Sequence, residues 1–345
     1  MEQYVGLVPD LLPEGALLRI YAPDRRRRQE LATRSPIRIA RAWAPWEWWD
    51  LIVLAEHLPL VFPPMENAVL MSHGLVRAGR APRGSFFYDR ERVLLSGEPV
   101  YAAICDPSER TAAEGERFVP QIAGRVRVTG DLRVDRMRRF AADEPANEMP
   151  QLLVMSTWGS DSLLESSGTE LLDQLVGLQR AGSAGVTLTC HPNLLEPSTS
   201  LRDWPSLLNA LSDEGVTVVH PSEPWEPVLA AADVIVTDHT SLCATFALLK
   251  RPIIPVACAR QAPDEGTFFA QLVASVDPWD PAAGDLKAAV SAALERGFPS
   301  DLEPAVDGMV DYLGTSRERF QEVFGEVMER AGSARGSSGR PRGSI

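Results

Sequence analysis

Cysteines and long apolar runs are scarce in this chain of 345 residues, and each shortage argues against a class of protein. The four cysteines (Cys105, Cys190, Cys243 and Cys258) show no CxxC or CxxH spacing, which argues against a zinc site. Each lies in or beside an apolar run, as reduced and buried thiols do in cytosolic proteins. No apolar run reaches the roughly 20 residues that a membrane-spanning helix needs. We therefore expect neither a metal site nor a transmembrane segment.

Positive charge is also in short supply. The 34 Lys and Arg residues are outnumbered by 47 Asp and Glu residues, which leaves a net charge of -13. This balance argues against a general nucleic-acid-binding protein, although a local cluster of donors can still hold a phosphate. The first residues, MEQYVGLVPDLLPEG, lack the basic start and the small-residue cleavage site of a signal peptide. We expect a cytoplasmic protein, at most peripheral to the inner face of the membrane.

The second half of the chain alternates short apolar runs with helical stretches. The apolar runs are QLLVMS, GVTLTCHP, VTVVHP, VIVTD and PIIPVAC, between residues 151 and 258. Strands that alternate with helices are typical of βαβ units in a parallel sheet, and continuously apolar strands are typical of sheets covered on both faces.

The first half shows a similar pattern with less regular spacing. Its strand candidates are LLRIYA, IRIARA, DLIVLAE, NAVLMSHG, VYAAICD and RVRVTGD. The polar, proline-bearing stretch 140–151 reads as a linker between the halves. We predict an α/β fold of two Rossmann-like domains that face a central cleft, with the first at 1–140 and the second at 150–300. Residues 301–331 are expected to form C-terminal helices that can cross back to the first domain, and 332–345, rich in Gly, Ser and Arg, a disordered tail.

Ligands of open parallel sheets bind beyond the carboxyl ends of the strands, so the residues that follow each strand are the ones to read. Four of the five histidines lie at such positions: His73, His191, His220 and His239. Hydroxyl side chains share these positions in the stretches STW (156–158) and TDHTS (237–241).

The stretch TDHTS has two interpretations. Asp238 and Thr240 can serve only to cap the helix that follows, as such residues commonly do. Alternatively, the N–H groups at the start of that helix bind a phosphate together with the hydroxyls of Thr240 and Ser241. The other polar strand ends favour phosphate binding.

His73 is a candidate general base. An imidazole with an ordinary pKa near 6.5 can accept a proton from a hydroxyl at neutral pH. Arg77 and Arg80 follow it within a few residues and could hold an anionic group. The alternative interpretation is an exposed loop histidine.

These motifs together resemble the CDP-glycerol glycerophosphotransferases of teichoic acid synthesis. The resemblance rests on HGLVR at 73–77, TGDLRVD at 129–135, MSTW at 155–158, His191 with Pro192, and TDHTS followed by LLKRPIIPV. The order of these motifs along the chain is also that of the family.

The resemblance implies a GT-B fold, with an acceptor domain first and a nucleotide-donor domain second. It implies that His73 is the base, that Arg77 neutralises charge, and that the donor's phosphates are held by a set of second-domain residues. That set is Thr157, His191, Asp238, His239, Thr240 and Ser241. Gly74, Gly130 and Arg133 are expected to line the cleft as well.

The implied reaction transfers glycerol phosphate, or another polyol phosphate, from a CDP-linked donor to an acceptor hydroxyl and releases CMP. The nucleotide is a substrate, so no cofactor and no metal are expected. Two alternatives remain open. One is a GT-B glycosyltransferase or sugar-nucleotide enzyme that uses a UDP- or GDP-sugar. The other is a catalytically silent binding subunit, because this chain has Gly159 and Asp161 where the family has an arginine, and Thr245 where it has an aspartate.

Overall fold

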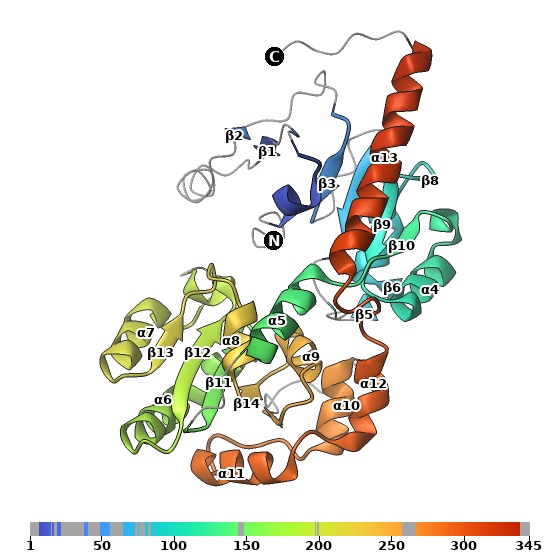
Figure 1. Ribbon diagram of the computed structural model, residues 1–345. Helices are drawn as coiled ribbons and strands as arrows, with labels where there is room; N and C mark the ends of the chain where they lie inside the picture. The colour runs from blue at the N-terminus through green and yellow to red at the C-terminus, as the bar shows by residue number, and fades with distance from the viewer. Residues whose placement is uncertain are drawn as a thin grey trace.

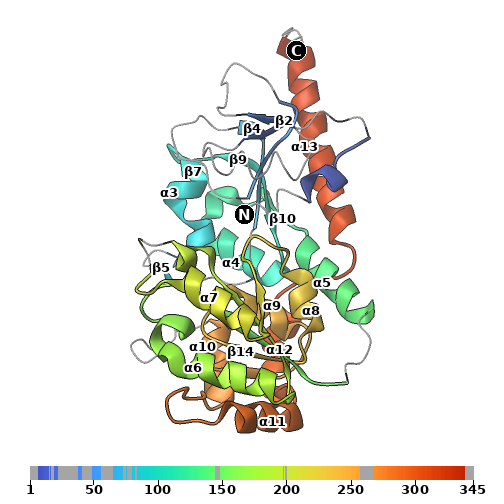
Figure 2. The same ribbon diagram turned by 90° about the vertical axis from the view of Figure 1, so that its left-hand side faces the viewer.

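The structure is a computed structural model, drawn in two orthogonal views in Figures 1 and 2. The residues it describes are 7–14, 16, 19–21, 38–40, 49–55, 65–72, 75, 80–81, 84–143, 148–196, 198, 200–256 and 267–338. Two parallel sheets lie at opposite ends of the molecule, the first above and the second below in both views. The predicted α/β fold with two parallel-sheet domains is confirmed.

The second sheet has the strand order β13-β12-β11-β14-β15, and every pairing in it is parallel. Its strands are β11 (Gln151–Ser156), β12 (Gly185–Cys190), β13 (Thr217–Val219), β14 (Val234–Thr237) and β15 (Ile253–Pro255). All five coincide with predicted apolar runs.

Helices cover both faces of the second sheet. They are α6 (Leu163–Arg180), α7 (Trp204–Asp213), α8 (Glu226–Ala231), α9 (Ser241–Ala247), α10 (Phe268–Ser275), α11 (Leu286–Arg296) and α12 (Glu303–Asp307). Alternate residues of β11 enter two different cores: Leu152 and Val154 pack with α6, α7 and α11, whereas Leu153 and Met155 pack with α8, α9 and α10. This alternation explains why the four positions from Leu152 to Met155 are all apolar.

The first sheet has the strand order β10-β9-β4-β3 and is also parallel. Its strands are β3 (Ile52–Leu54), β4 (Met65–Met71), β9 (Tyr101–Asp106) and β10 (Val126–Val128). Helix α4 (Glu109–Phe118) contacts β9 and β10, and the terminal helix α13 (Ser316–Ser338) contacts β4 and β9.

The remaining described elements are short. They are η1 (Val8–Leu11), β1 (Arg19–Tyr21), β2 (Arg38–Ala40), β5 (Arg80–Ala81), β6 (Gly84–Ser85), η2 (Phe86–Tyr88), α3 (Arg90–Val93), β7 (Leu94–Leu95), β8 (Glu98–Pro99), η3 (Pro120–Ile122), η4 (Pro192–Leu195) and η5 (Ser300–Leu302). Strands β1 and β2 pair in parallel with each other and form a separate sheet of two strands.

Helix α5 (Leu132–Asp143) follows the first sheet in sequence but packs against the second domain. Its buried Val134 and Met137 enter the core that contains Ile235 and Phe246, and in both views the helix lies beside α8. Part of the stretch predicted as a linker, Phe140 to Asp143, is therefore helical. The domain boundary at 140–150 stays a prediction.

The predicted disordered tail at 332–345 is wrong for its first residues, because α13 continues to Ser338. Phe320, Phe324 and Val327 anchor this helix on the first sheet, and adding further turns to a formed helix costs little. The next proline, Pro341, is beyond its end. No helix among the described residues is long and apolar enough to cross a membrane.

Candidate functional site

The carboxyl ends of neighbouring strands bring most of the predicted donor-binding residues to one edge of the second sheet. Strand β11 lies between β12 and β14, so Thr157 follows the central strand, with His191 on one side and Asp238 on the other. The His191 N–H donates to the Ser156 carbonyl at 2.9 Å, which fixes the first of these neighbours. We call this edge, formed by residues 156–158, 191 and 238–241, the strand-end rim.

Asp238 is the centre of the rim but is itself 0% exposed. Its carboxylate accepts from the N–H groups of Thr157 (2.9 and 3.0 Å), Leu163 (2.8 Å) and Thr240 (3.1 Å). The Ser156 hydroxyl donates to it at 3.3 Å. Burial raises the pKa of Asp238, and these backbone donors act against that rise.

The expectation that Asp238 contacts the donor's phosphates is therefore corrected. A carboxylate that is fully buried and surrounded by the chain's own donors has no surface left for a ligand. Asp238 instead holds the loops after β11 and β14 in a fixed relation, which positions the exposed residues beside it.

The N–H groups in the first turn of α6 already donate hydrogen bonds to side chains of the protein. The Leu163 N–H donates to Asp238, the Leu164 N–H to Ser156 Oγ at 3.1 Å, and the Glu165 N–H to Ser162 Oγ at 3.3 Å. Each of these donors would otherwise attract an anion to the helix start. The loop between β11 and α6 thus offers a phosphate little, and the start of α9 is the more open position.

At the start of α9 three polar residues are exposed to solvent to different degrees. His239 and Ser241 are exposed and Thr240 is half-buried. Thr240 is the N-cap residue, yet its side chain makes no capping hydrogen bond. The His239 ring meets Phe269 edge-on, with centroids 6.3 Å apart. Thr240 and Ser241 thus lie at the rim, and the contact of their hydroxyls with a phosphate stays a prediction.

His191 lies half-buried at the rim, and its protonation follows from one contact. Its Nδ1 atom accepts a hydrogen bond from the Asn193 N–H at 3.1 Å, so Nδ1 carries no proton. Desolvation by burial lowers the pKa of His191, so the ring is neutral at pH 7 and its proton lies on Nε2. The ring is therefore a hydrogen-bond donor, which suits a phosphate oxygen.

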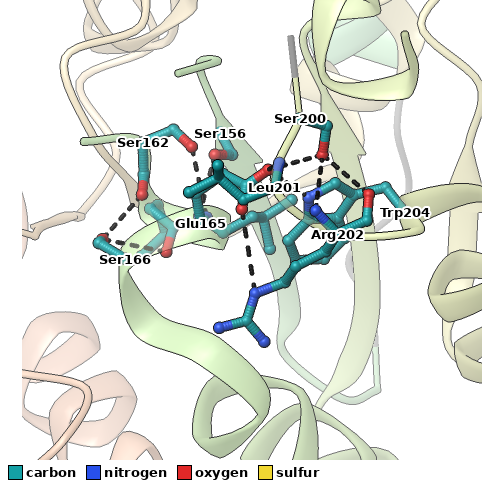
Figure 3. A network of polar contacts seen from close by, with 10 residues as sticks. Ser156, Ser162, Glu165, Ser166, Ser200, Leu201, Arg202 and Trp204 are labelled. Carbon is teal, nitrogen blue, oxygen red and sulfur yellow. Dashed lines mark hydrogen bonds and ion pairs between the residues drawn. The ribbon is translucent and has the colours of Figure 1, made fainter. Parts of the chain in front are cut away.

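A network around Glu165 holds the loop that follows η4 (Figure 3). Glu165 Oε1 accepts from the Ser200 hydroxyl (2.7 Å), the Leu201 N–H (3.0 Å) and the Trp204 indole N–H (2.9 Å). Desolvation acts to raise the pKa of Glu165, but these hydrogen bonds outweigh it and the pKa is lowered. The carboxylate fastens the loop after His191 to the first turn of α6.

Glu165 is a supporting residue that the sequence analysis missed. The stretch Ser162-Leu-Leu-Glu165 has the spacing of a capping box, and Ser162 is indeed the N-cap of α6. That signal places the helix start at Ser162. The structure has non-helical backbone angles at Gly168 (φ 63°, ψ -151°), so this glycine marks a kink inside α6.

The predicted catalytic residues His73 and Arg77, together with Gly74, lie outside the described residues. Leu75 is described, and it is buried in the core of the second domain beside α5. The assignments of base and charge-neutralising residue stay predictions.

Arg133 does not line a cleft, which corrects the expectation. Its guanidinium is 2% exposed and donates to both carboxylate oxygens of Glu226, at 3.1 and 2.6 Å. The guanidinium also makes a cation–π contact with Trp225, whose ring centroid lies 4.0 Å from the guanidinium carbon. Arg133 thus joins α5 to α8 and is a structural residue.

Gly130 is structural for a different reason. Its φ is +72°, and a Cβ atom there would lie 2.7 Å from the Asp311 carbonyl and would collide with Ser316 Oγ. Asp135, in the same TGDLRVD motif, accepts from the Gly314 N–H (2.6 Å) and the Ser316 N–H (3.1 Å) at the start of α13. This motif therefore builds the junction between the two domains and α13.

Comparison with known proteins finds a family match in the second half of the chain. Residues 148–261 match the family described as "CDP-Glycerol:Poly(glycerophosphate) glycerophosphotransferase". This segment contains the whole strand-end rim. No curated protein sequence matches the chain significantly.

Solved structures with a similar fold include several of the wall teichoic acid polymerase TagF. One TagF variant soaked with CDPG has a TM-score of 0.54 at 13% identity and covers 81% of this chain and 72% of that chain. A second TagF variant gives a TM-score of 0.54 at 13% identity, with 82% and 73% covered. These matches agree with the expected GT-B fold. Residues 148–261 thus match the model of the CDP-glycerol glycerophosphotransferase family, and the chain shares its fold with TagF.

Proposed function

We propose that the chain transfers glycerol phosphate, or a related polyol phosphate, from a CDP-linked donor to an acceptor hydroxyl and releases CMP. One observation carries this proposal: the family match at 148–261 coincides with a strand-end rim that presents the hydroxyls of Thr240 and Ser241 and the neutral ring of His191. Hydroxyl and N–H donors of this kind suit phosphate oxygens.

The reaction balances as a displacement at phosphorus. The acceptor oxygen forms a bond to the β-phosphorus of the donor, and the bond from that phosphorus to the bridging oxygen breaks. CMP leaves with the bridging oxygen, and the hydroxyl proton passes to a base, for which we propose His73. Such a transfer depends on positioning and on charge neutralisation. The nucleotide donor is a substrate in this reaction, and we propose no cofactor.

In this proposal the second domain binds the donor and the first domain supplies the acceptor side. Asp238 contributes by holding Thr157 and Thr240 in place. Thr157 itself is half-buried, with its N–H already donated to Asp238, so its hydroxyl is the group proposed to face the donor.

The identity of the released nucleotide tests this proposal. The full chain is incubated separately with CDP-glycerol, UDP-glucose and GDP-mannose, each with a glycerol-phosphate primer, and the products are separated by anion-exchange chromatography. Transfer at phosphorus releases CMP, a nucleoside monophosphate, whereas glycosyl transfer at carbon releases a nucleoside diphosphate.

We expect CMP from CDP-glycerol and its loss in a His73→Ala variant. Release of UDP or GDP from a sugar nucleotide contradicts the proposal in favour of a glycosyltransferase. Binding of a nucleotide without turnover of any donor contradicts it in favour of a silent binding subunit.

A further inference from the structure

Trp158 is an exposed aromatic residue at the middle of the strand-end rim. It follows β11, the central strand, by two residues, and its exposure is 45%. In contrast, Trp204, in the neighbouring loop and helix, is 0% exposed. A large indole that is half exposed at a strand end indicates a ligand site, because contact with a ligand would remove its apolar surface from water.

The contact with His191 gives the surface around Trp158 two kinds of recognition. The two ring centroids are 5.9 Å apart and the planes are inclined by 32°. Because His191 Nδ1 accepts from Asn193, the free ring N–H is on Nε2. A flat apolar face and a hydrogen-bond donor therefore lie within one nucleotide's length of each other. This is the chemistry that a nucleoside joined to a phosphate requires.

The backbone around Trp158 is held firmly. The preceding Thr157 N–H donates to both oxygens of the buried Asp238, and the Ser162 N–H closes a turn onto the Gly159 carbonyl at 3.0 Å. Gly159 has φ +94°, a backbone conformation that favours glycine and lets the chain turn directly after Trp158. An aromatic residue on a backbone fixed in this way loses little conformational freedom when it binds a ligand.

The geometry points to Trp158 as the residue that stacks on the nucleobase of a nucleoside diphosphate, with His191 Nε2 donating to a phosphate oxygen of the same molecule. The assignment of the nucleotide as the donor rests on the proposed function, but the stacking itself needs only that a nucleotide binds. Stacking tolerates any base, so Trp158 provides affinity for the nucleotide, and it does not select cytosine.

The test compares ligands with and without a base. Isothermal titration calorimetry is carried out with CDP, CMP and inorganic pyrophosphate on the full chain and on its Trp158→Ala and Trp158→Phe variants. Phe118→Ala serves as a matched control, because Phe118 is another exposed aromatic (41%) on α4, away from the rim. The melting temperature of each variant is recorded to show that it folds.

We expect Trp158→Ala to weaken CDP binding by about 5- to 150-fold, which is the range that the loss of one base-aromatic stack represents. Trp158→Phe retains most of the affinity, and pyrophosphate binding and the Phe118→Ala control are unchanged. CDP affinity within twofold of wild type in Trp158→Ala overturns the proposal, as does an equal loss of pyrophosphate affinity, and so does a wild-type chain that binds no nucleotide.

The outcomes separate this inference from the proposed function. CDP binding that depends on Trp158, in a chain that releases no CMP from CDP-glycerol, supports the stacking and contradicts the transferase. CMP release by a Trp158→Ala variant with unchanged CDP affinity supports the transferase and contradicts the stacking.

Discussion

Removing Glu226 tests whether the buried ion pair between α5 and α8 holds these two helices together. Glu226 is 1% exposed and Arg133 2%, and two hydrogen bonds at 3.1 and 2.6 Å join them. In Glu226→Ala the guanidinium stays buried on Trp225 without its carboxylate. Breaking such a pair from one side costs about 3–5 kcal/mol, a large part of the roughly 5–15 kcal/mol of a typical domain.

The assay is urea unfolding followed by circular dichroism, with the free energy of unfolding taken at 25 °C. Arg136→Ala is the control, because Arg136 also approaches Glu226 (3.5 Å) but is 34% exposed, and we expect it to cost less than about 1 kcal/mol. The double variant Arg133→Met with Glu226→Leu removes both charges, so we expect it to recover most of the loss. A Glu226→Ala variant within about 1 kcal/mol of wild type would refute the reasoning.

Three further predictions follow from single residues. Asp238→Asn turns one acceptor oxygen into a donor that faces backbone N–H groups, and we expect a loss of about 2–4 kcal/mol in urea unfolding; an unchanged midpoint contradicts this. Gly130→Ala adds both strain at positive φ and a collision with Ser316, so we expect a clear fall in melting temperature. The fall should exceed that of Gly97→Ala, where φ is +88° and no atom lies near the new Cβ. Equal shifts in the two variants would rule out the collision. Burial lowers the pKa of His191 below 6.5, so the unfolded chain binds the proton more readily than the folded chain. The free energy of unfolding should therefore increase as the pH rises toward 6.5, and His191→Gln should flatten this slope. An identical slope in the variant and the wild type would contradict the prediction.

Local sequence signals predicted the second sheet well. The stretch QLLVMS coincides with β11, because a strand covered on both faces has an apolar run at its centre, here Leu152 to Met155. The strand-end rule also placed Thr157, His191 and Asp238 together, since parallel strands end at one edge.

Burial and distant partners could not be predicted in the same way. A carboxylate after a strand fits both a ligand contact and an internal cap, and only the fold shows that Asp238 faces inward. Arg133 finds its partner Glu226 93 residues later, a pairing that no local pattern reveals. For the same reason α5 was not expected on the second domain, although its apolar positions Val134 and Met137 are visible in the sequence.

We propose that the strand-end rim of the second domain binds a cytidine nucleotide donor. The most direct measurement is the melting temperature of the full chain with CDP-glycerol, CDP, UDP and GDP, repeated with His191→Ala and with Ser241→Ala. We predict that CDP-glycerol and CDP raise the wild-type melting temperature selectively and that both variants lose this shift while keeping their ligand-free melting temperatures. Equal shifts in wild type and variants, or no shift with any nucleotide, would contradict the claim.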